Sequence, residues 1–381
     1  EYPFRSRSKR VAAALFDRVG YFLTRGGLRA KPPEPKSVRK ILVVRLDHIG
    51  DVLYSLPLLP ALKALYPGAG VSFLVGPWAK DLLLHNPHLH EVLVWDCPWM
   101  RRDGRKGMGG TLGFMRGLRR HRFDVALELR GDLRNILLLS LAGVSFRAGY
   151  AITGGGFLLN LELPHQTGIH QVERNLEVVR ALGAQGPFEE PKLYLSQEER
   201  KEAAALLKEL GVGEGELLVG VHPGAGYPTK RWGGDRFSLL IRRLINELSA
   251  RVILFGSTAE KALAEKILDG AGEGGLPSRP LNLVGRTSLR QFMALAERLD
   301  LFIGNDSGPG HLAASLGTTF IGIFSGTNRV EEWGPRGSGA VVVRAEVDCA
   351  PCELTSCADL TCLERVTVEQ VLEVARACVS A

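Results

Sequence analysis

Two short glycine-containing segments in opposite halves of the chain combine small residues with carboxylates. DHIGD, at 47–51, follows the apolar run 41–44, and GNDSGPGH, at 304–311, follows the apolar run 301–303. Both segments are typical of the turn between a buried parallel strand and the next helix, which is where open α/β sheets bind ligands. We therefore expect a carboxylate site in one domain, an anion-binding helix start in the other, and a cleft between them.

Four motifs in the same order resemble glycosyltransferase family 9, the bacterial heptosyltransferases. The first runs through 41–67, with GD at 50–51 and LPLLPALK at 56–63. The others are HPGA at 222–225 with KRW at 230–232, FGS at 255–257, and NDSGP at 305–309 with HLAA at 311–314. The resemblance covers about residues 39–375. It implies a GT-B fold, in which two Rossmann-like domains with parallel sheets face a cleft.

Asp51 is the residue of the first segment with the most definite chemistry. The resemblance places the family's catalytic Asp here. A general base at this position takes the proton from an acceptor hydroxyl during sugar transfer with inversion, and Gly50 lets substrate approach the backbone closely. An ordinary helix N-cap is the alternative, because Asp is favoured there. Asp47 lies nearby but off the motif.

Small and cationic residues in the second half fit the diphosphate of a nucleotide-sugar donor. Ser307, where the family usually has Thr, and Gly308 mark a helix start whose N–H groups and dipole attract an anion. Gly224 and Ala225 let backbone amides approach a phosphate, and Lys230 supplies a compact charge for the leaving diphosphate. A plain strand–turn–helix connection is the alternative.

Three polar side chains border these turns. His311 can donate to a phosphate oxygen or pack as an ordinary surface residue, and Asp306 can fix the turn or orient donor hydroxyls. Glu260 can bond the donor's ribose or base, or compensate a helix N-terminus. No Asp-x-Asp motif occupies a comparable turn. This pattern predicts transfer without a divalent metal and without a cofactor.

A basic stretch at 99–122 contains eight Arg or Lys and several glycines, which predicts a mobile loop. In the family, basic residues after the third strand of the first domain face the acidic acceptor. Arg101, Arg102 and Arg105 match them most nearly, and Arg130 and Arg134 are further candidates. A solvated basic loop is the alternative.

Four cysteines lie close together near the end of the chain. They are Cys349, Cys352, Cys357 and Cys362. In a cytosolic protein this density favours a metal over disulfides. One expectation is a structural zinc or iron–sulfur site, and the other is reduced thiols without a ligand, since the spacing is irregular for zinc.

The net charge of +7 belongs to the N-terminal segment. Residues 1–40 hold eleven Lys or Arg and three acids, a balance of +8, so the rest of the chain is near neutral. Apolar residues at 11, 15, 19, 22 and 23 form a helical stripe. A basic amphipathic helix commonly lies in a membrane interface, although a helix packed on the body or a disordered tail fits the same pattern. PPEP at 32–35 reads as a stiff linker.

No apolar run reaches the ~18 residues of a membrane span, and no secretory signal is recognised. We therefore expect a cytoplasmic protein, peripheral on the inner face of the cytoplasmic membrane. The 45% hydrophobic and 23% charged content is that of a globular protein. The near-neutral body lacks the basic-aromatic platform of a nucleic-acid binder.

From residue 39 onward, strand-like runs alternate with helical patterns, which predicts two Rossmann-like α/β domains with parallel sheets. Expected strands are 41–44, 71–75, 91–94, 124–129, 217–221, 251–255, 282–284, 301–303 and 320–324. Expected helices are 52–66, 80–85, 133–141, 172–182, 237–248, 260–268 and 289–299. The predicted parts are the basic segment and linker 1–38, an acceptor-binding domain 39–188, a nucleotide-sugar-binding domain 189–365, and a C-terminal helix 366–381 that packs back on the first domain in one arrangement.

The resemblance implies transfer of a heptose from an ADP-sugar to an anionic, lipid-linked core oligosaccharide of lipopolysaccharide. One alternative is a family member that uses another nucleotide sugar or glycan acceptor. Another is a non-catalytic, membrane-associated nucleotide-sugar binder. Asp51 together with Lys230 disfavours the binder, because binding alone has no use for a base.

Overall fold

The computed structural model describes residues 6–100, 110–273 and 275–380. The chain divides into two compact units, Glu1–Pro191 and Lys192–Ala381. The division falls three residues after the boundary expected at 188. Each unit contains a six-stranded sheet, and the neighbouring strands of both sheets are paired in parallel. This arrangement confirms the predicted α/β class.

The first sheet has the order β3-β2-β1-β4-β5-β6. Its strands are β1 (Lys40–Val44), β2 (Gly70–Val75), β3 (Glu91–Val94), β4 (Val125–Glu128), β5 (Phe146–Tyr150) and β6 (Leu161–Leu163). β1 and β4 are central, and their runs of Ile, Leu and Val are buried, as parallel strands covered on both faces require. β5 and β6 are absent from the sequence-based expectation, because their short runs include Gly, Arg and Glu.

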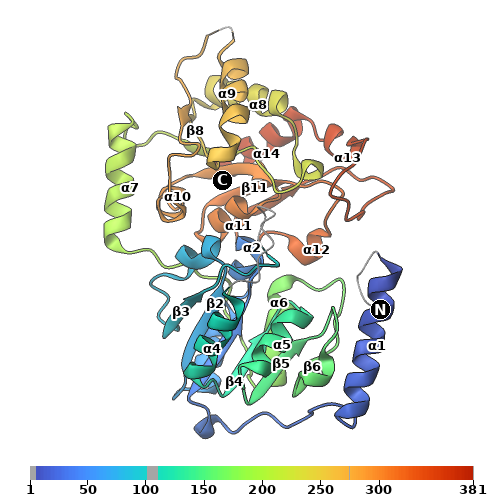
Figure 1. Ribbon diagram of the computed structural model, residues 1–381. Coiled ribbons are helices and arrows are strands. Elements are labelled where there is room, and N and C mark those ends of the chain that lie inside the picture. The colour runs from blue at the N-terminus through green and yellow to red at the C-terminus, as the bar shows by residue number, and fades with distance from the viewer. Residues whose placement is uncertain (1–5, 101–109, 274, 381) are drawn as a thin grey trace. The chain divides into compact units, whose positions relative to one another are not determined.

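The helices of the first unit differ from expectation in three places. They are α1 (Arg7–Leu23), α2 (Ile49–Leu53), α3 (Leu58–Leu65), α4 (Thr111–His121), α5 (Leu133–Leu141) and α6 (Gln171–Ala181). The single helix expected at 52–66 is instead α2 and α3, because Pro57 has no N–H to continue the helical ladder. Part of the expected mobile loop at 99–122 is α4. The helix expected at 80–85 overlaps the end of a 3-10 segment, Pro77–Leu83. Figure 1 shows these elements in blue to green.

The second sheet repeats the strand order of the first. Its strands are β7 (Leu218–His222), β8 (Arg251–Leu254), β9 (Leu281–Asn282), β10 (Leu301–Asn305), β11 (Thr319–Ile323) and β12 (Ala340–Val343). The order β12-β11-β10-β7-β8-β9 places β7 and β10 at the centre, as β1 and β4 are in the first sheet. In both sheets the strand order reverses at this central pair, and ligands bind beyond the carboxyl ends of strands at such a point.

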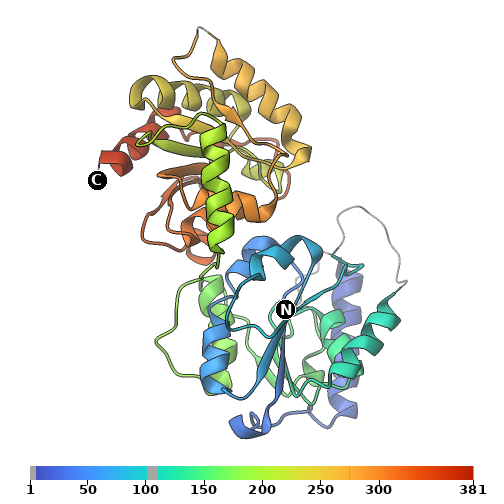
Figure 2. The same ribbon diagram turned by 90° about the vertical axis from the view of Figure 1, so that its left-hand side faces the viewer.

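The helices of the second unit are α7 (Gln197–Glu209), α8 (Gly234–Leu248), α9 (Lys261–Gly272), α10 (Leu289–Ala296), α11 (Gly308–Ser315), α12 (Val330–Trp333), α13 (Thr361–Glu364) and α14 (Val368–Ser380). Figure 2 shows α7 in yellow-green in front of this unit. It is joined to α10 by Arg290, whose Nε donates to Glu199 Oε1 at 2.6 Å.

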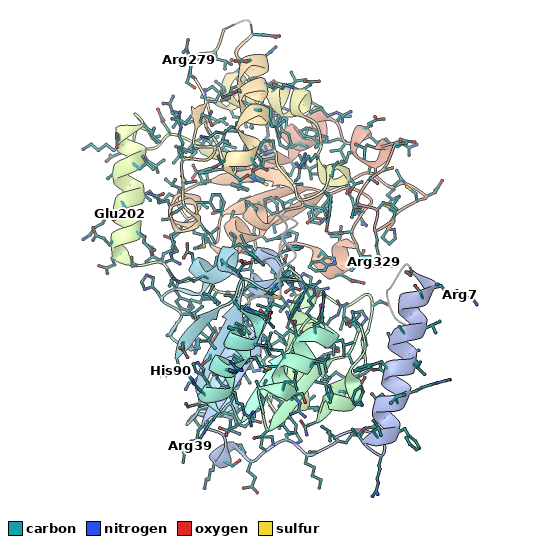
Figure 3. The ribbon with its side chains drawn as sticks, viewed as in Figure 1. Arg7, Arg39, His90, Glu202, Arg279 and Arg329 are labelled. Atoms are coloured by element: carbon teal, nitrogen blue, oxygen red, sulfur yellow. The ribbon has the colours of Figure 1, made fainter. Side chains whose placement is uncertain are left out.

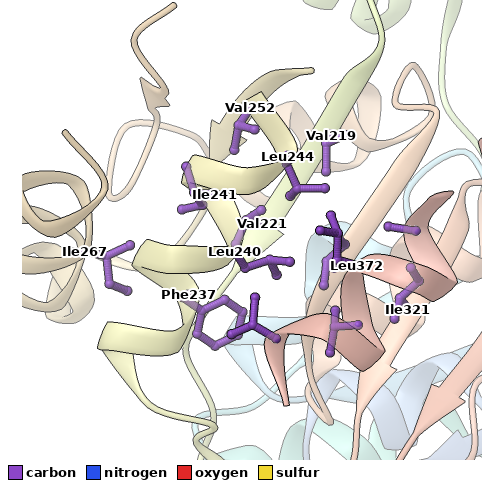
Figure 4. Close-up of a cluster of buried hydrophobic side chains, with 14 of the residues drawn as sticks. Val219, Val221, Phe237, Leu240, Ile241, Leu244, Val252, Ile267, Ile321 and Leu372 are labelled. Atoms are coloured by element: carbon purple, nitrogen blue, oxygen red, sulfur yellow. The ribbon is translucent and has the colours of Figure 1, made fainter. Parts of the chain in front are cut away.

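The core of the second unit decides where the C-terminal helix lies. Phe237, Leu240 and Leu244 of α8 pack with Leu372 of α14 and Ile321 of β11 (Figure 4). All five side chains are buried, and burying each one contributes about 1.5–3 kcal/mol. The apolar face of α14 is therefore used within the second unit.

In the part of the chain that the structure describes, none of the helices has the length and apolarity needed to cross a membrane.

Candidate active site

Asp51 lies at the carboxyl end of β1, in the first turn of α2. Its Oδ2 accepts a hydrogen bond from the backbone N–H of His48 at 3.1 Å. His48 is the N-cap of α2 and Asp51 its third residue, so Asp51 makes the reciprocal contact of a capping box and is not the N-cap itself. Its Oδ1 is 2.8 Å from Arg45 Nη2, and the residue is buried. Two contacts on two oxygens hold the carboxylate in one orientation, which suits a group that must meet a hydroxyl at a fixed place.

Arg45 ties Asp51 to a second carboxylate that sequence reasoning left aside. Its Nε is 2.9 Å from Asp47 Oδ1, and its Nη1 donates to the Leu129 carbonyl at 2.6 Å. Burial raises the pKa of Asp47 to about 6; the charge of Arg45 opposes this rise and the charge of Asp51 adds to it. The sequence could have indicated a role for Arg45 and Asp47 by their position alone, because both follow β1 directly, at the carboxyl end of a central strand.

Glu128 is a further buried carboxyl group, at the end of the neighbouring strand β4. Asn135 Nδ2 donates to Glu128 Oε1 at 2.9 Å, and the backbone N–H of Gly131 donates to Oε2. Burial raises the pKa of Glu128 to about 8, although both hydrogen bonds favour the charged form. Trp99 Nε1 donates to Asn135 Oδ1 at 3.3 Å. Sequence reasoning missed Glu128, yet an acid that ends an apolar strand is a recognisable signal.

The structure describes two of the five arginines predicted to face the acceptor, Arg130 and Arg134. Arg101, Arg102 and Arg105 lie outside the described residues. Arg134 binds Asp132 through Nε at 2.9 Å and Nη2 at 2.6 Å, and its guanidinium lies 5.2 Å from the centre of the Trp99 ring.

The partner carboxylate, Asp132, also lies 3.9 Å from Arg130 Nε. Burial acts to raise the pKa of Asp132, but the hydrogen bond and charge of Arg134 outweigh it and hold that pKa below its usual value. Arg130 additionally contacts the sulfur of Met100. Half of the Arg134 side chain is exposed, so it keeps donors for an anionic ligand.

In the second unit, Asp306 contacts the side chains of two other residues predicted for the donor site, Lys230 and His311. Its Oδ2 is 2.7 Å from Lys230 Nζ and accepts from Asn328 Nδ2 at 2.8 Å, and its Oδ1 is 3.3 Å from His311 Nε2. Burial acts to raise the pKa of Asp306, but the hydrogen bond from His311 and the charge of Lys230 keep it below the usual value. Lys230, Asp306 and His311 are therefore brought together. Asn328, which sequence reasoning missed, joins them from the loop after β11.

Ser307 begins helix α11 but does not cap it with its hydroxyl. Its Oγ donates to the Asn305 carbonyl at 3.2 Å and lies 3.3 Å from His222 Nδ1. The helix starts at Gly308, and Pro309 lies in its first turn. Pro309 has no N–H, and the Gly310 N–H donates to the Ser307 carbonyl at 3.1 Å. Anion binding at this helix start therefore stays a sequence-based prediction.

Glu260 makes the contacts expected of a residue that compensates a helix N-terminus, which was the alternative to a donor-binding role. Its Oε2 accepts from the Ser257 backbone N–H at 2.6 Å and from the Ser257 hydroxyl at 2.8 Å, and lies 3.8 Å from His222 Nε2. Burial acts to raise the pKa of Glu260, but His222 and Ser257 lower it to about 2. His222, unassigned in the sequence analysis, thus lies between Glu260 and Ser307.

The turn after β7 comes very close to this carboxylate. A Cβ added at Gly224 would lie 1.5 Å from Glu260 Oε1, so a larger residue there would displace the Glu260 carboxylate. Asn305 Nδ2 donates to the Pro223 carbonyl at 2.7 Å, and Arg231 Nε donates to the Ala225 carbonyl at 3.1 Å. These bonds fix the turn beside the start of α11, at the central strands β7 and β10.

The four cysteines predicted as a metal site line one cavity of about 330 Å³. Cys349 and Cys357 are exposed and Cys352 and Cys362 are partly buried. Among the described residues, no group of three or more His, Cys, Asp or Glu side chains is placed to hold a metal ion. The side chains as placed therefore do not fit the predicted metal, which stays a sequence-based prediction.

Known proteins resemble this chain in sequence. The sequence model of glycosyltransferase family 9 (heptosyltransferase) matches residues 111–361. The lipopolysaccharide heptosyltransferase 2 of Salmonella typhimurium is 28% identical over 295 residues, which is 75% of this chain and 82% of that protein.

Solved structures extend the likeness over more of the chain. The ADP-heptose lipopolysaccharide heptosyltransferase II of Escherichia coli aligns with a TM-score of 0.72 and 25% identity, covering 89% of this chain and 98% of that one. The Escherichia coli heptosyltransferase WaaC with ADP aligns with a TM-score of 0.66 and 18% identity, covering 89% and 99%. The predicted GT-B fold is confirmed.

Proposed function

Because this chain belongs to glycosyltransferase family 9, we propose that it is an inverting, metal-independent heptosyltransferase. Its proposed donor is an ADP-heptose, and its acceptor an anionic, lipid-linked core oligosaccharide of lipopolysaccharide. The observation that carries the proposal is Asp51, a buried carboxylate oriented by Arg45 at the carboxyl end of β1. The donor assignment is supported by the Escherichia coli relative whose name contains ADP-heptose.

In the proposed reaction Asp51 acts as the general base. It takes the proton of an acceptor hydroxyl while the hydroxyl oxygen attacks the anomeric carbon of the heptose. The bond between that carbon and the diphosphate oxygen breaks, and the diphosphate leaves with the electron pair. Attack opposite the leaving group inverts the configuration at the anomeric carbon. One carboxylate is enough for this displacement.

The leaving diphosphate is proposed to bind at the start of α11 beside Lys230. Helix-start N–H groups and a lysine ammonium stabilise the negative charge that grows as the bond breaks. Lys230 is paired with Asp306 at 2.7 Å, so the phosphate shares the ammonium with this carboxylate. His311, Ser307 and His222 border the same turn and are the proposed hydrogen-bonding partners of the donor.

The acceptor is proposed to be anionic, and Arg130 and Arg134 are the described cations for it. The lipid-linked acceptor places the enzyme at the cytoplasmic face of the membrane as a peripheral protein. No nucleic-acid partner is proposed.

Release of ADP tests the proposal. The protein is incubated with ADP-heptose and a delipidated core oligosaccharide, and the product is analysed for its anomeric configuration. Thermal shift with ADP-, UDP-, GDP- and CDP-sugars compares donors under the same conditions. We expect stabilisation by the ADP-sugar and an inverted product. Stabilisation by another nucleotide sugar alone would contradict the donor, and a retained configuration would contradict the single-base reaction.

A further inference from the structure

Helix α1 is fixed to the first unit through a face of small and polar residues. Ala13, Asp17 and Gly20 are buried, and a Cβ added at Gly20 would lie 2.3 Å from the Phe157 ring. Asp17 Oδ1 accepts from the Gly155 backbone N–H at 2.7 Å. The helix is therefore docked on the 3-10 turn Gly156–Leu158 and its flanks, and it is not a free tail.

Further contacts fix the orientation of α1. Tyr21 donates its hydroxyl hydrogen to Glu162 Oε2 at 2.6 Å, on strand β6. The backbone N–H of Leu28 donates to the Phe157 carbonyl at 3.2 Å, and that of Ala30 to the Asn160 carbonyl at 3.1 Å. Figure 1 shows α1 in blue beside β6. These bonds determine which face of the helix is turned away from the unit.

The outward face carries large apolar side chains. Leu15 is 62% exposed and Phe22 is 81% exposed, and Val11, Val19 and Leu23 are exposed as well. Half of the exposed large apolar residues in the described chain lie on α1 or at Leu28 just after it. Single exposed apolar residues are ordinary, but a concentration of this kind marks an interaction surface.

The same face is cationic. Arg7 and Arg18 lie four residues before and seven after Val11, so helical periodicity places them on the apolar face. Both are exposed, and Arg7 points away from the unit in Figure 3. Arg18 lies at the edge of this face, where it also borders a cavity with Glu162 of the first unit. Asp17, the helix's only acid, is turned into the protein. The outward face thus combines apolar side chains with positive charge and carries no acid.

Apolar side chains together with positive charge on one face of α1 favour an anionic bilayer over a second copy of the chain as the partner of this face. A second copy of the chain would bring Arg7 and Arg18 against the same two arginines, and like charges without a compensating acid oppose such pairing. An anionic bilayer offers both an apolar interior and negative headgroups, which is what a cationic amphipathic helix in an interface requires.

We propose that the outward face of α1 lies in the interface of an anionic lipid bilayer. Val11, Leu15 and Phe22 enter the acyl boundary, while Arg7 and Arg18 contact phosphate headgroups. The inference deepens the proposed function by naming the surface that brings the enzyme to a lipid-linked acceptor, and it rests on that function only for this purpose. It explains why a helix docked by small residues keeps its largest apolar side chains in water.

The test is co-sedimentation of the full chain with vesicles of phosphatidylcholine containing about 30 mol% phosphatidylglycerol. We expect Leu15→Ser/Phe22→Ser to lower the partition coefficient by about tenfold for each large side chain that no longer leaves water. Arg7→Gln/Arg18→Gln should weaken binding to these vesicles and reduce its dependence on salt. Leu141→Ser is the matched control, because Leu141 is also 62% exposed but lies on α5. It should bind as the wild type does.

Two further measurements keep the outcomes separate. Sedimentation of Leu15→Ser/Phe22→Ser equal to that of the wild type and Leu141→Ser would overturn the inference. A wild-type dimer that becomes a monomer in Leu15→Ser/Phe22→Ser would overturn it in favour of a second copy. Turnover on a delipidated acceptor should be unchanged by these substitutions. If the wild type sediments with the vesicles but transfers no sugar to the acceptor, the proposed function is contradicted and the docking surface is still supported.

Discussion

Replacing Asp51 by Asn removes the proposed base while it keeps the shape of the side chain. We expect the turnover number to fall by at least ~10²-fold, which is the usual contribution of general base catalysis. Donor affinity should change little, because the proposed donor contacts lie on Lys230, Ser307 and their neighbours. The measurement is ADP release at saturating donor and acceptor, with donor binding followed separately by calorimetry.

The structure also sets the cost of this change to stability. Asn has one acceptor oxygen for the two donors that now face Asp51, Arg45 Nη2 and the His48 N–H. One of these hydrogen bonds is lost, and a hydrogen bond to a charged group contributes about 1.5–3 kcal/mol. Arg45 keeps Asp47 and the Leu129 carbonyl. The loss should therefore stay below the ~3–5 kcal/mol that follows when a buried charge is left alone, and urea denaturation measures it.

Asp47→Asn is the matched control for this experiment. It perturbs the same guanidinium, since Asp47 Oδ1 lies 2.9 Å from Arg45 Nε, but it leaves Asp51 in place. We expect it to keep turnover within about tenfold of the wild type. Near-wild-type turnover of Asp51→Asn would refute the reasoning. A larger loss in Asp47→Asn than in Asp51→Asn would assign the base to Asp47 instead.

Three further predictions concern other groups. Lys230→Ala should weaken donor binding by about 10–100-fold, the equivalent of one charged hydrogen bond, and turnover should survive EDTA; if magnesium restores an activity that EDTA abolished, the leaving-group assignment is wrong. Burial raises the pKa of Glu128 to about 8, above the ~4.3 of an unfolded chain, so the stability this group contributes is present below about pH 4 and lost as pH rises through 8. The wild type should therefore lose more unfolding free energy over that pH range than Glu128→Gln does. Parallel plots of unfolding free energy against pH for the two proteins would contradict this. The sequence-based prediction of a metal at the four cysteines expects about one equivalent of zinc or iron in protein purified without a histidine tag, and elemental analysis below about 0.2 equivalents would refute it.

Local patterns made much of the fold predictable. β3 and α5 begin and end where the alternation of strand-like and helix-like runs placed them. Misses came where a local signal was weak or mixed. β5 contains Arg and Gly within five residues, and α4 lies in a basic, glycine-containing stretch that reads as a loop. Pro57 was visible in the sequence, and its missing N–H explains the division between α2 and α3.

The candidate site was predictable where position in a motif is enough. Asp51, Ser307 and Gly308 were recognised because each follows a strand end in a glycine-containing turn. Lys230 was recognised from the KRW motif, eight residues after the end of β7. Their partners were not recognised. Glu128 is 77 residues from Asp51 along the chain, and only the pairing of β1 with β4 brings their strand ends together.

The two α/β domains, the glycine-containing turns and the cationic amphipathic segment could be inferred from local composition and spacing, and the family from the resemblance of four ordered motifs. Tertiary structure alone decided the ion-pair partners of Asp51 and Lys230, the buried position of Glu128, and which face of α1 is turned outward. These depend on packing between segments far apart in the chain. Asp17 faces inward, where it accepts from the Gly155 backbone N–H. The ring of Phe157 is contacted by Phe16 and Tyr21, at 5.4 and 5.9 Å between ring centres, while Phe22 stays 81% exposed. The sequence of α1 does not determine which face of the helix packs on the protein, since its apolar stripe is the same whichever face is docked.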